Sequence, residues 1–160
     1  MNVIRPAHRR SARRAVVTVE MALALPLLLL LLLGIVEVGL VVMDALSLQN
    51  AAREAVRLAT LGRSTSQVSA QVSATLTSVL PAQQVTVTLT KRVLSGGVWS
   101  AWTALGDTTV DGTTQNDATA GDQVRVTLAY GHPLITGYVL GALAPQGLLQ
   151  MHVASVAMRM

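Results

Sequence analysis

The most prominent feature of the chain is an apolar run from Met21 to Met43. Glu37 is the only charged residue within it, and Asp44 follows directly after it. An α-helix of this length rises about 35 Å, which is enough to cross a hydrocarbon core of about 30 Å with some tilt. The pattern therefore predicts a membrane-spanning helix near the start of the chain.

The helical pattern continues beyond this run. A narrow stripe of mostly small residues recurs at helical spacing, formed by Leu48, Ala52, Ala55 and Ala59, and Gly62 has the residue type that ends helices. The stripe suits a bundle with other protomers or packing on the chain's own sheet, and we favour the second. The neighbouring charged residues, Arg53, Glu54 and Arg57, predict a solvent-exposed helix face.

The second half of the chain predicts one amphipathic helix and three strands. The helix lies in "STSQVSAQVSATLTSVLP", where Pro81 ends it and one face carries Val68, Val72, Leu76, Val79 and Leu80. Residues 84–93 and 123–130 alternate apolar with polar side chains, as half-buried strands do, and residues 148–160 can form a third strand. We expect an α+β fold, with the long helix continuing into a small head that contains an antiparallel sheet.

The charge distribution adds an orientation to this picture. The net charge is +4, but five arginines precede Glu20, and the remaining chain has seven basic and eight acidic residues. A basic block beside an apolar run is typical of a topology signal, not of a nucleic-acid surface. The positive-inside rule then predicts a cytoplasmic N-terminus and an extracytoplasmic head in a single-pass protein of the inner membrane. With no cysteine, the chain has no disulfide framework.

A cleavable secretory signal is the competing interpretation of the same features. No small-residue cleavage site follows the leucine run, however, and the helical pattern continues past it. We therefore expect the apolar helix to stay attached to the head as its anchor.

The two glutamates of the anchor are 17 residues apart, Glu20 at its start and Glu37 inside it. That separation is about 25 Å along a helix, so both carboxylates can lie near the edges of the hydrocarbon. For Glu37 we favour a carboxylate that reaches toward headgroups over a buried pairing partner.

The anchor and its extension resemble the TadE-like family, small pilin-like proteins of tight-adherence (Flp-type) pilus systems. The matching segments are "RRAVVTVEMALALPLLLLLLLGIVEVG" and "LQNAAREAVRLAT". They supply the family's pattern of residues at Glu20, Pro26, Gly34, Ile35, Glu37, Gly39, Ala51, Ala52, Arg53, Glu54 and Arg57. The resemblance implies a pilin-like fold and a role for Glu20, Pro26, Gly34, Glu37 and Gly39 in helix contacts during assembly.

The resemblance also implies processing by a prepilin peptidase, which would cut between Ala15 and Val16. The residue before the cut is normally glycine in pilin-like proteins, and here it is alanine. A cleaved chain would offer its new amino terminus at Val16 as a partner for Glu20. An uncleaved chain could use Arg13 or Arg14 instead.

Other candidate sites are weaker. Four aspartates in the polar segment 106–122, Asp107, Asp111, Asp117 and Asp122, lack the spacing of a calcium loop and predict a solvated loop. His132 and His152 have no metal-ligand companions in the sequence, and no serine lies in a nucleophile motif. Trp99 and Trp102 favour hairpin packing, with a contact surface as the alternative.

These observations predict three regions: a basic leader (1–15), the anchor helix with its extension (16–62), and an extracytoplasmic α+β head (63–160). We expect a minor pilin or pseudopilin-like protein without enzyme activity, metal or cofactor. Its expected partners are the membrane, other pilin-like subunits, the pilus platform and a prepilin peptidase, and not nucleic acid. A membrane-tethered binding domain that does not polymerise is the alternative.

Overall fold

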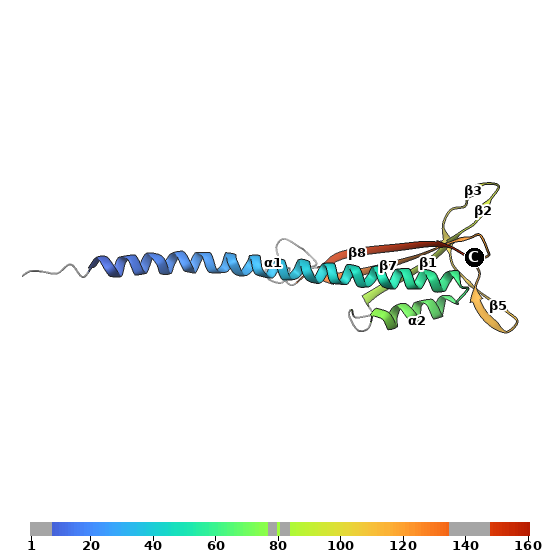
Figure 1. Cartoon of the computed structure of the whole chain (residues 1–160), viewed down its shortest axis with the longest axis horizontal. Helices are drawn as coiled ribbons and strands as arrows, with labels where there is room; N and C mark the ends of the chain where they lie inside the picture. The colour runs from blue at the N-terminus through green and yellow to red at the C-terminus, as the bar shows by residue number, and fades with distance from the viewer. Residues whose placement is uncertain (1–7, 77–79, 81–83, 135–147) are drawn as a thin grey trace, which may run out of the picture.

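The structure is a computed structural model that describes residues 8–76, 80, 84–134 and 148–160, with side chains from residue 16 onward in those ranges. Helix α1 (His8–Thr60) is 53 residues long and runs without a break into the head (Figure 1). Pro26 lies inside the helix but does not end it. We call residues 16–43 the apolar part of α1 and residues 44–60 its head-bound part.

The C-terminus of α1 has the hydrogen bonds of a Schellman motif. Gly62 adopts a positive φ of 82°, its amide donates to the carbonyl of Ala59 at 3.1 Å, and the Arg63 amide donates to Leu58 at 3.2 Å. Because the left-handed conformation suits glycine, Gly62 ends the helix where the sequence predicts.

Helix α2 (Thr65–Leu76) begins with a reciprocal cap. The Gln67 amide donates to the Ser64 hydroxyl and the Ser64 amide donates to the Gln67 side chain, each at 3.3 Å. Its buried face carries Val68, Val72 and Leu76, as the pattern predicts. Leu80 is also buried, whereas Val79 and Pro81 lie outside the described residues.

The main sheet has four antiparallel strands in the order β4-β1-β7-β8. Their bounds are β1 (Val85–Arg92), β4 (Thr103–Ala104), β7 (Gln123–Pro133) and β8 (Leu148–Met158). The three long strands correspond to the three predicted segments. They run alongside the C-terminal half of α1 (Figure 1).

Two small hairpins extend from the end of the head that lies far from the apolar part of α1 (Figure 1). One joins β2 (Leu94–Ser95) to β3 (Val98–Trp99), and the other joins β5 (Asp107–Val110) to β6 (Thr113–Asn116). Asp111 and Gly112 both have positive φ in the second turn. This two-residue turn matches the right-handed twist of the flanking strands, so segment 106–122 is not the plain loop predicted from its polarity.

The hydrophobic core lies between the helices and one face of the sheet. The head-bound part of α1 contributes its small-residue stripe, whose members Leu48, Ala52, Ala55 and Ala59 are at most 1% exposed. The sheet contributes alternating residues of β7, which are Val124, Val126, Leu128 and Tyr130. The stripe therefore packs on the chain's own sheet, and the predicted α+β fold is confirmed.

Candidate functional site

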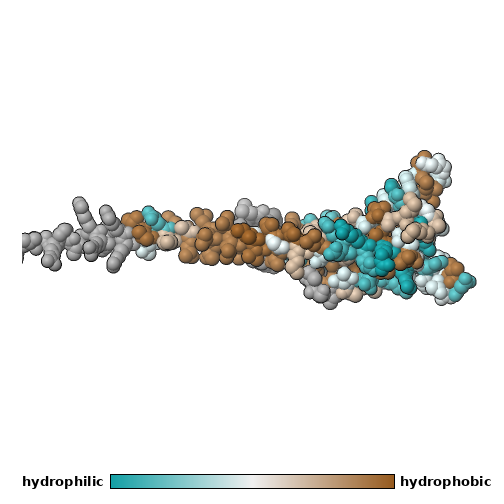
Figure 2. All heavy atoms as spheres, viewed as in Figure 1, coloured by the Kyte–Doolittle hydropathy of each residue, from teal (hydrophilic) through white to brown (hydrophobic). Residues whose placement is uncertain are grey.

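The apolar part of α1 stands apart from the head and exposes most of its side chains. Figure 2 shows it as a mostly hydrophobic cylinder with a small hydrophilic patch near its start. Within the residues described, α1 alone has the length and composition to cross a membrane. An apolar surface of this extent is costly in water and stable in lipid or against another apolar helix.

Glu20 lies on this exposed surface, near the start of the apolar part. Pro26 is also exposed, one and a half turns further along α1. Neither side chain is covered by the head, so both are accessible to lipid or to a partner helix. Their roles in assembly remain predictions.

Glu37 differs from its neighbours because it is buried, with 7% of its surface exposed. It lines an apolar groove of about 490 Å³ between α1 and the start of β8. The groove is lined by Leu30, Gly34, Glu37, Val38, Val41, Val42, Leu134 and Leu149. The expectation that this carboxylate reaches outward to headgroups is therefore wrong: the Glu37 side chain is enclosed at the junction of anchor and head.

Gly34 and Gly39 have open space around them. A Cβ atom added at either position would meet no heavy atom within 4 Å. The chain's own fold therefore does not require glycine there through close packing. Glycines in a membrane helix allow another helix to approach closely, so the predicted contact role stays open.

A buried hydrogen-bonded pair joins α1 to the sheet just beyond the apolar part. Nδ1 of His132, on β7, lies 2.5 Å from Oδ2 of Asp44, and the two residues are 5% and 8% exposed. Nε2 of His132 is buried and has no hydrogen-bond partner among the described groups. The Tyr130 ring meets the His132 ring edge-on at 6.4 Å. Burial, and then the nearby negative charge of Asp44, raises the pKa of the Tyr130 hydroxyl.

The sequence shows no metal-ligand companion for His132 and does not identify its hydrogen-bond partner. Asp44 and His132 are 88 residues apart, and each lies at the end of an apolar pattern. No local signal in the sequence near either residue identifies this contact. His152, by contrast, is exposed on β8.

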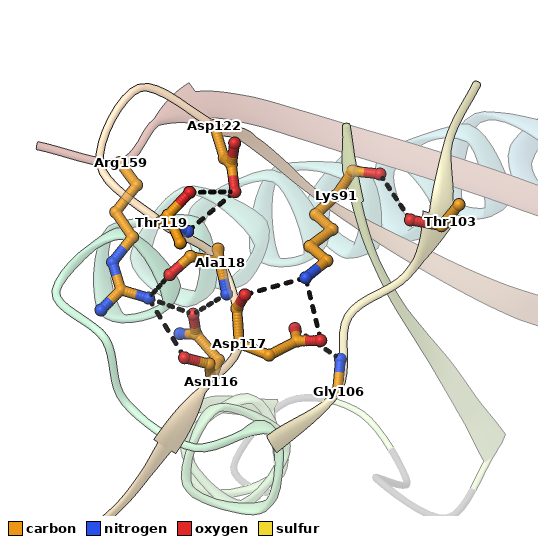
Figure 3. A network of polar contacts seen from close by, with 9 residues as sticks. All are labelled: Lys91, Thr103, Gly106, Asn116, Asp117, Ala118, Thr119, Asp122 and Arg159. Carbon is orange, nitrogen blue, oxygen red and sulfur yellow. Dashed lines mark hydrogen bonds and ion pairs between the residues drawn. The ribbon is translucent and has the colours of Figure 1, made fainter. Parts of the chain in front are cut away.

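At the far end of the head, a polar network replaces the solvated loop that the aspartates predict (Figure 3). Asp117 pairs with Lys91 at 2.9 Å and accepts a 2.9 Å hydrogen bond from the Gly106 amide. Partial burial alone would raise the pKa of Asp117, but the Lys91 and Gly106 contacts lower it overall. Asp122 is buried and accepts two hydrogen bonds from Thr119.

The same network fastens the β5–β6 hairpin to α1. Asn116 is 1% exposed and donates to the carbonyls of Ala59 and Arg63 at 2.7 and 2.8 Å. Arg159 donates to both oxygens of Asn116 and to the carbonyl of Ala118 (Figure 3). Asp107 accepts two 2.7 Å hydrogen bonds from Thr65 at the start of α2. The described residues contain no group of three or more His, Asp or Glu side chains that could hold a metal ion.

Trp99 and Trp102 form a stack with two arginines beside the β2–β3 hairpin. The Arg92 guanidinium lies 4.9 Å from the Trp99 ring centre and 4.6 Å from that of Trp102. The guanidinium of Arg125, which is on β7, lies 4.2 Å from the ring centre of Trp102. Cation–π contacts of this kind hold the hairpin against the sheet, in agreement with the predicted packing role.

Fold and site together define a small α+β head carried on one apolar helix that can anchor it to a membrane by a single pass. Residues 15–57 match the family described as TadE-like protein, in agreement with the resemblance seen in the sequence. The match implies involvement in Tad pilus systems and association with their components in general. Comparisons with curated proteins and with solved structures found no match.

Proposed function

We propose that the protein is a minor pilin or pseudopilin-like subunit of a Tad (Flp-type) pilus or a related secretion apparatus. The observation that carries the proposal is an overlap: the TadE-like match spans residues 15–57, and most of the apolar surface that the head leaves uncovered lies in the same stretch. In this role the apolar part of α1 holds the subunit in the inner membrane and packs against the helices of other pilin-like subunits.

The proposed orientation places the leader in the cytoplasm and the head outside the inner membrane, because five arginines precede Glu20. The proposal includes no catalytic role and no cofactor, since the sequence carries no recognised spacing of a nucleophile, a base or a phosphate loop. Contacts with subunits and the platform would be the whole of its activity.

Glu20 is the residue that we assign to assembly. It is an exposed carboxylate at the start of an apolar helix, where a cationic partner would offset the cost of its charge. If the chain is cut after Ala15, the new ammonium group at Val16 lies four residues from Glu20, about one helical turn away. Cleavage would also remove the arginine block, each basic residue of which contributes about 1 kcal/mol to holding an anionic membrane surface.

The test is to replace Glu20 by alanine in the full chain, with Glu54→Ala as the matched control on the head-bound part of α1. Glu20→Ala should reduce surface pili and co-purification with the pilus platform, while the thermal unfolding of the head stays unchanged. Glu54→Ala should leave assembly intact, because Glu54 pairs only locally with Arg57 at 2.7 Å. Unchanged pili and co-purification in Glu20→Ala would contradict the proposal.

Processing decides where the subunit acts. N-terminal mapping with and without the peptidase, in wild type and in Ala15→Gly, should show cleavage before Val16. We tie cleavage to a place in the fibre and an intact leader to a resident assembly factor in the membrane. A fully uncut chain in sheared pili would contradict that link.

The alternative function is a membrane-tethered binding domain that does not polymerise. It is favoured by the stack of Trp99, Arg92, Trp102 and Arg125, which lies at the end of the head far from the anchor. Deletion of the protein separates the two functions: loss of pili supports the pilus subunit, and normal pili support the tethered binding domain.

A further inference from the structure

Within the described residues, strand β8 forms an edge of the main sheet and lacks the usual protection of an edge strand. It is 11 residues long, and its register with β7 is unbroken from Leu148 to Met158. Its sequence, "LLQMHVASVAM", contains no Asp, Glu, Lys, Arg or Pro. Native proteins usually blunt such edges with charges, proline or bulges, because an open edge pairs readily with another strand.

The open side of β8 is accessible. A shallow hollow of about 320 Å³ runs between α1 and β8, lined by Gln49, Ala52, Arg53 and residues 152–155. His152, Ala154 and Val156 are exposed on the face of the sheet that lies away from the core. Among the described strands, only β7 pairs with β8. An incoming strand therefore has both backbone groups and room available here.

The opposite edge of the sheet is also open over part of its length. Strand β4 pairs with β1 only at Thr90 and Lys91, and the Leu89 carbonyl accepts a hydrogen bond from the Leu105 amide at 3.0 Å, so within the described part of the chain Val85–Thr88 has no strand beyond it. This segment, "VTVT", is uncharged as well. One molecule thus carries two unprotected edges on opposite sides of one sheet.

We propose that the β8 edge is a docking site for a second copy of this chain, which pairs its β1 edge (Val85–Thr88) with β8 in parallel. The sheet then continues from one subunit into the next. This inference goes beyond the proposed pilus role, because it requires only that two copies lie in the same membrane with the same orientation.

The direction of the strands selects this pairing. β1 and β8 are both antiparallel to β7, so they are parallel to each other. A second copy placed beside the first in the same orientation therefore presents β1 parallel to β8, and both apolar parts of α1 point the same way. An antiparallel β8–β8 pair would invert one subunit and direct its apolar helix away from the shared membrane. Because the two paired edges differ, the contact can repeat along a row of subunits.

The side chains beside the new seam are compatible with it. Thr86 and Thr88 on β1 and Ala154 and Val156 on β8 are exposed on the same outer face of the sheet. They are small or β-branched, and none is charged, so adjacent strands can approach to about 4.8 Å. Confinement in one membrane raises the effective concentration of the second edge, which favours a contact of only about four residues.

Because the native chain has no cysteine, introduced cysteines report this contact directly. Thr88 and Ala154 both pair with Thr127, so they lie on either side of β7. Two strand spacings separate them by about 9.6 Å, beyond the reach of a disulfide, which needs Cα atoms within about 6.8 Å. The pair Thr88→Cys/Ala154→Cys can therefore cross-link only between copies, and Thr86→Cys/Val156→Cys tests a second register.

The full-length double variants are oxidised in native membranes and resolved by gel electrophoresis and mass spectrometry. We expect dimers and a ladder of higher oligomers from at least one double variant, and loss of the ladder in the single variants. Equal dimer formation by Ala154→Cys alone would indicate a β8–β8 contact and overturn the proposal. A membrane-inserted, folded protein without a ladder, or one cross-linked only to a different protein, would also overturn it.

A charge on the edge provides the second test. Ala154→Lys, added to the cross-linking pair Thr86→Cys/Val156→Cys, should abolish most of the ladder, because lysine on an edge strand opposes pairing. The matched control is Thr127→Lys, which adds the same charge to the same face on the central strand β7. The control should keep the ladder. Loss of the ladder in both variants, with both still folded, would place the contact on the sheet face and overturn the edge pairing.

Discussion

The two parts of α1 belong to one continuous helix but meet opposite surroundings. In the apolar part, Leu31 and Leu32 are 65% and 58% exposed, whereas Leu48 and Ala52 in the head-bound part are both 0% exposed. The apolar part is rich in leucine and needs lipid or another helix to cover it. The head-bound part is rich in alanine, which allows the sheet to approach it closely. The comparison shows that one helix can serve as an anchor along one segment and as part of a core along the next.

The change from one environment to the other falls at the hydrogen-bonded pair of Asp44 and His132. This pair fixes the sheet to α1 directly beside the anchor, so the head cannot pivot freely about the helix. A force on the apolar part would therefore be transmitted to the head through a rigid helix and a buried contact. The predictions below separate the two parts of α1, beginning with the largest expected effect.

Breaking the Asp44–His132 pair should lower the free energy of unfolding of the head more than any of the changes that follow. His132→Leu leaves the Asp44 carboxylate buried without its partner, and such a loss typically costs about 3–5 kcal/mol. Thermal unfolding of the full chain in detergent measures it. The double variant Asp44→Leu/His132→Leu removes both polar groups and should recover much of the loss. Equal stability of His132→Leu and wild type would show that the pair does not hold the junction.

Shortening a core leucine of α1 should lower the free energy of unfolding of the head by nearly as much. Leu48→Ala removes a side chain that is 0% exposed, with an expected loss of about 2–5 kcal/mol. Leu46→Ala is the matched control two residues earlier on α1, where the side chain is 55% exposed. Its effect on unfolding of the head should be within about 0.5 kcal/mol. Similar losses from both variants would remove the distinction between the two faces of α1.

Replacing a glycine in the head should lower stability, whereas replacing one in the apolar part of α1 should not, and the difference should be smaller than for the leucines. Gly62→Ala places a side chain at a φ of 82°, and the left-handed conformation costs a non-glycine residue about 1–2 kcal/mol. Gly39→Ala has no neighbour within 4 Å of the added Cβ, so the head should unfold as in wild type. Chemical denaturation of both variants checks this. A loss of stability in Gly39→Ala equal to that in Gly62→Ala would contradict the account.

The smallest expected effect is on the stability of the head at low pH. The pKa of Asp117 is lowered from its ordinary value of 3.8, so its stabilisation is present above that value and is lost as the pH falls through the folded-state pKa. Because its side chain is 35% exposed, we expect only about 1 kcal/mol. Asp117→Asn should flatten the loss of stability below about pH 4, and Asp111→Asn at the tip of the β5–β6 hairpin should not. Identical acid unfolding of wild type and Asp117→Asn would contradict this contribution.

Local patterns predicted most of the fold. The apolar run, the stripe ending at Gly62 and the alternation in three strands each depend on neighbouring residues, and the structure has all three. The β5–β6 hairpin was missed because polarity was taken to indicate a loop, although the dipeptide Asp111-Gly112 is a typical hairpin turn.

The candidate site was less predictable, because its contacts join distant residues. Nothing in the sequence near Asp44 indicates His132, and burial of Glu37 follows from how the head meets α1 and not from the spacing of the anchor. The stack of Arg92 and Arg125 on the tryptophans likewise requires the register of β1 against β7. Long-range pairing of this kind has no local signal.

The central claim is that α1 crosses the membrane once and holds the head outside. Single cysteines in the cysteine-free chain test it, one in the leader (Ser11→Cys) and one on the exposed β5–β6 hairpin (Thr109→Cys), with a membrane-impermeant maleimide added to spheroplasts of cells that lack the prepilin peptidase, so that the leader is retained. The account predicts labelling of Thr109→Cys in intact spheroplasts and labelling of Ser11→Cys only after the membrane is opened. Protection of Thr109→Cys together with labelling of Ser11→Cys in intact spheroplasts would contradict it.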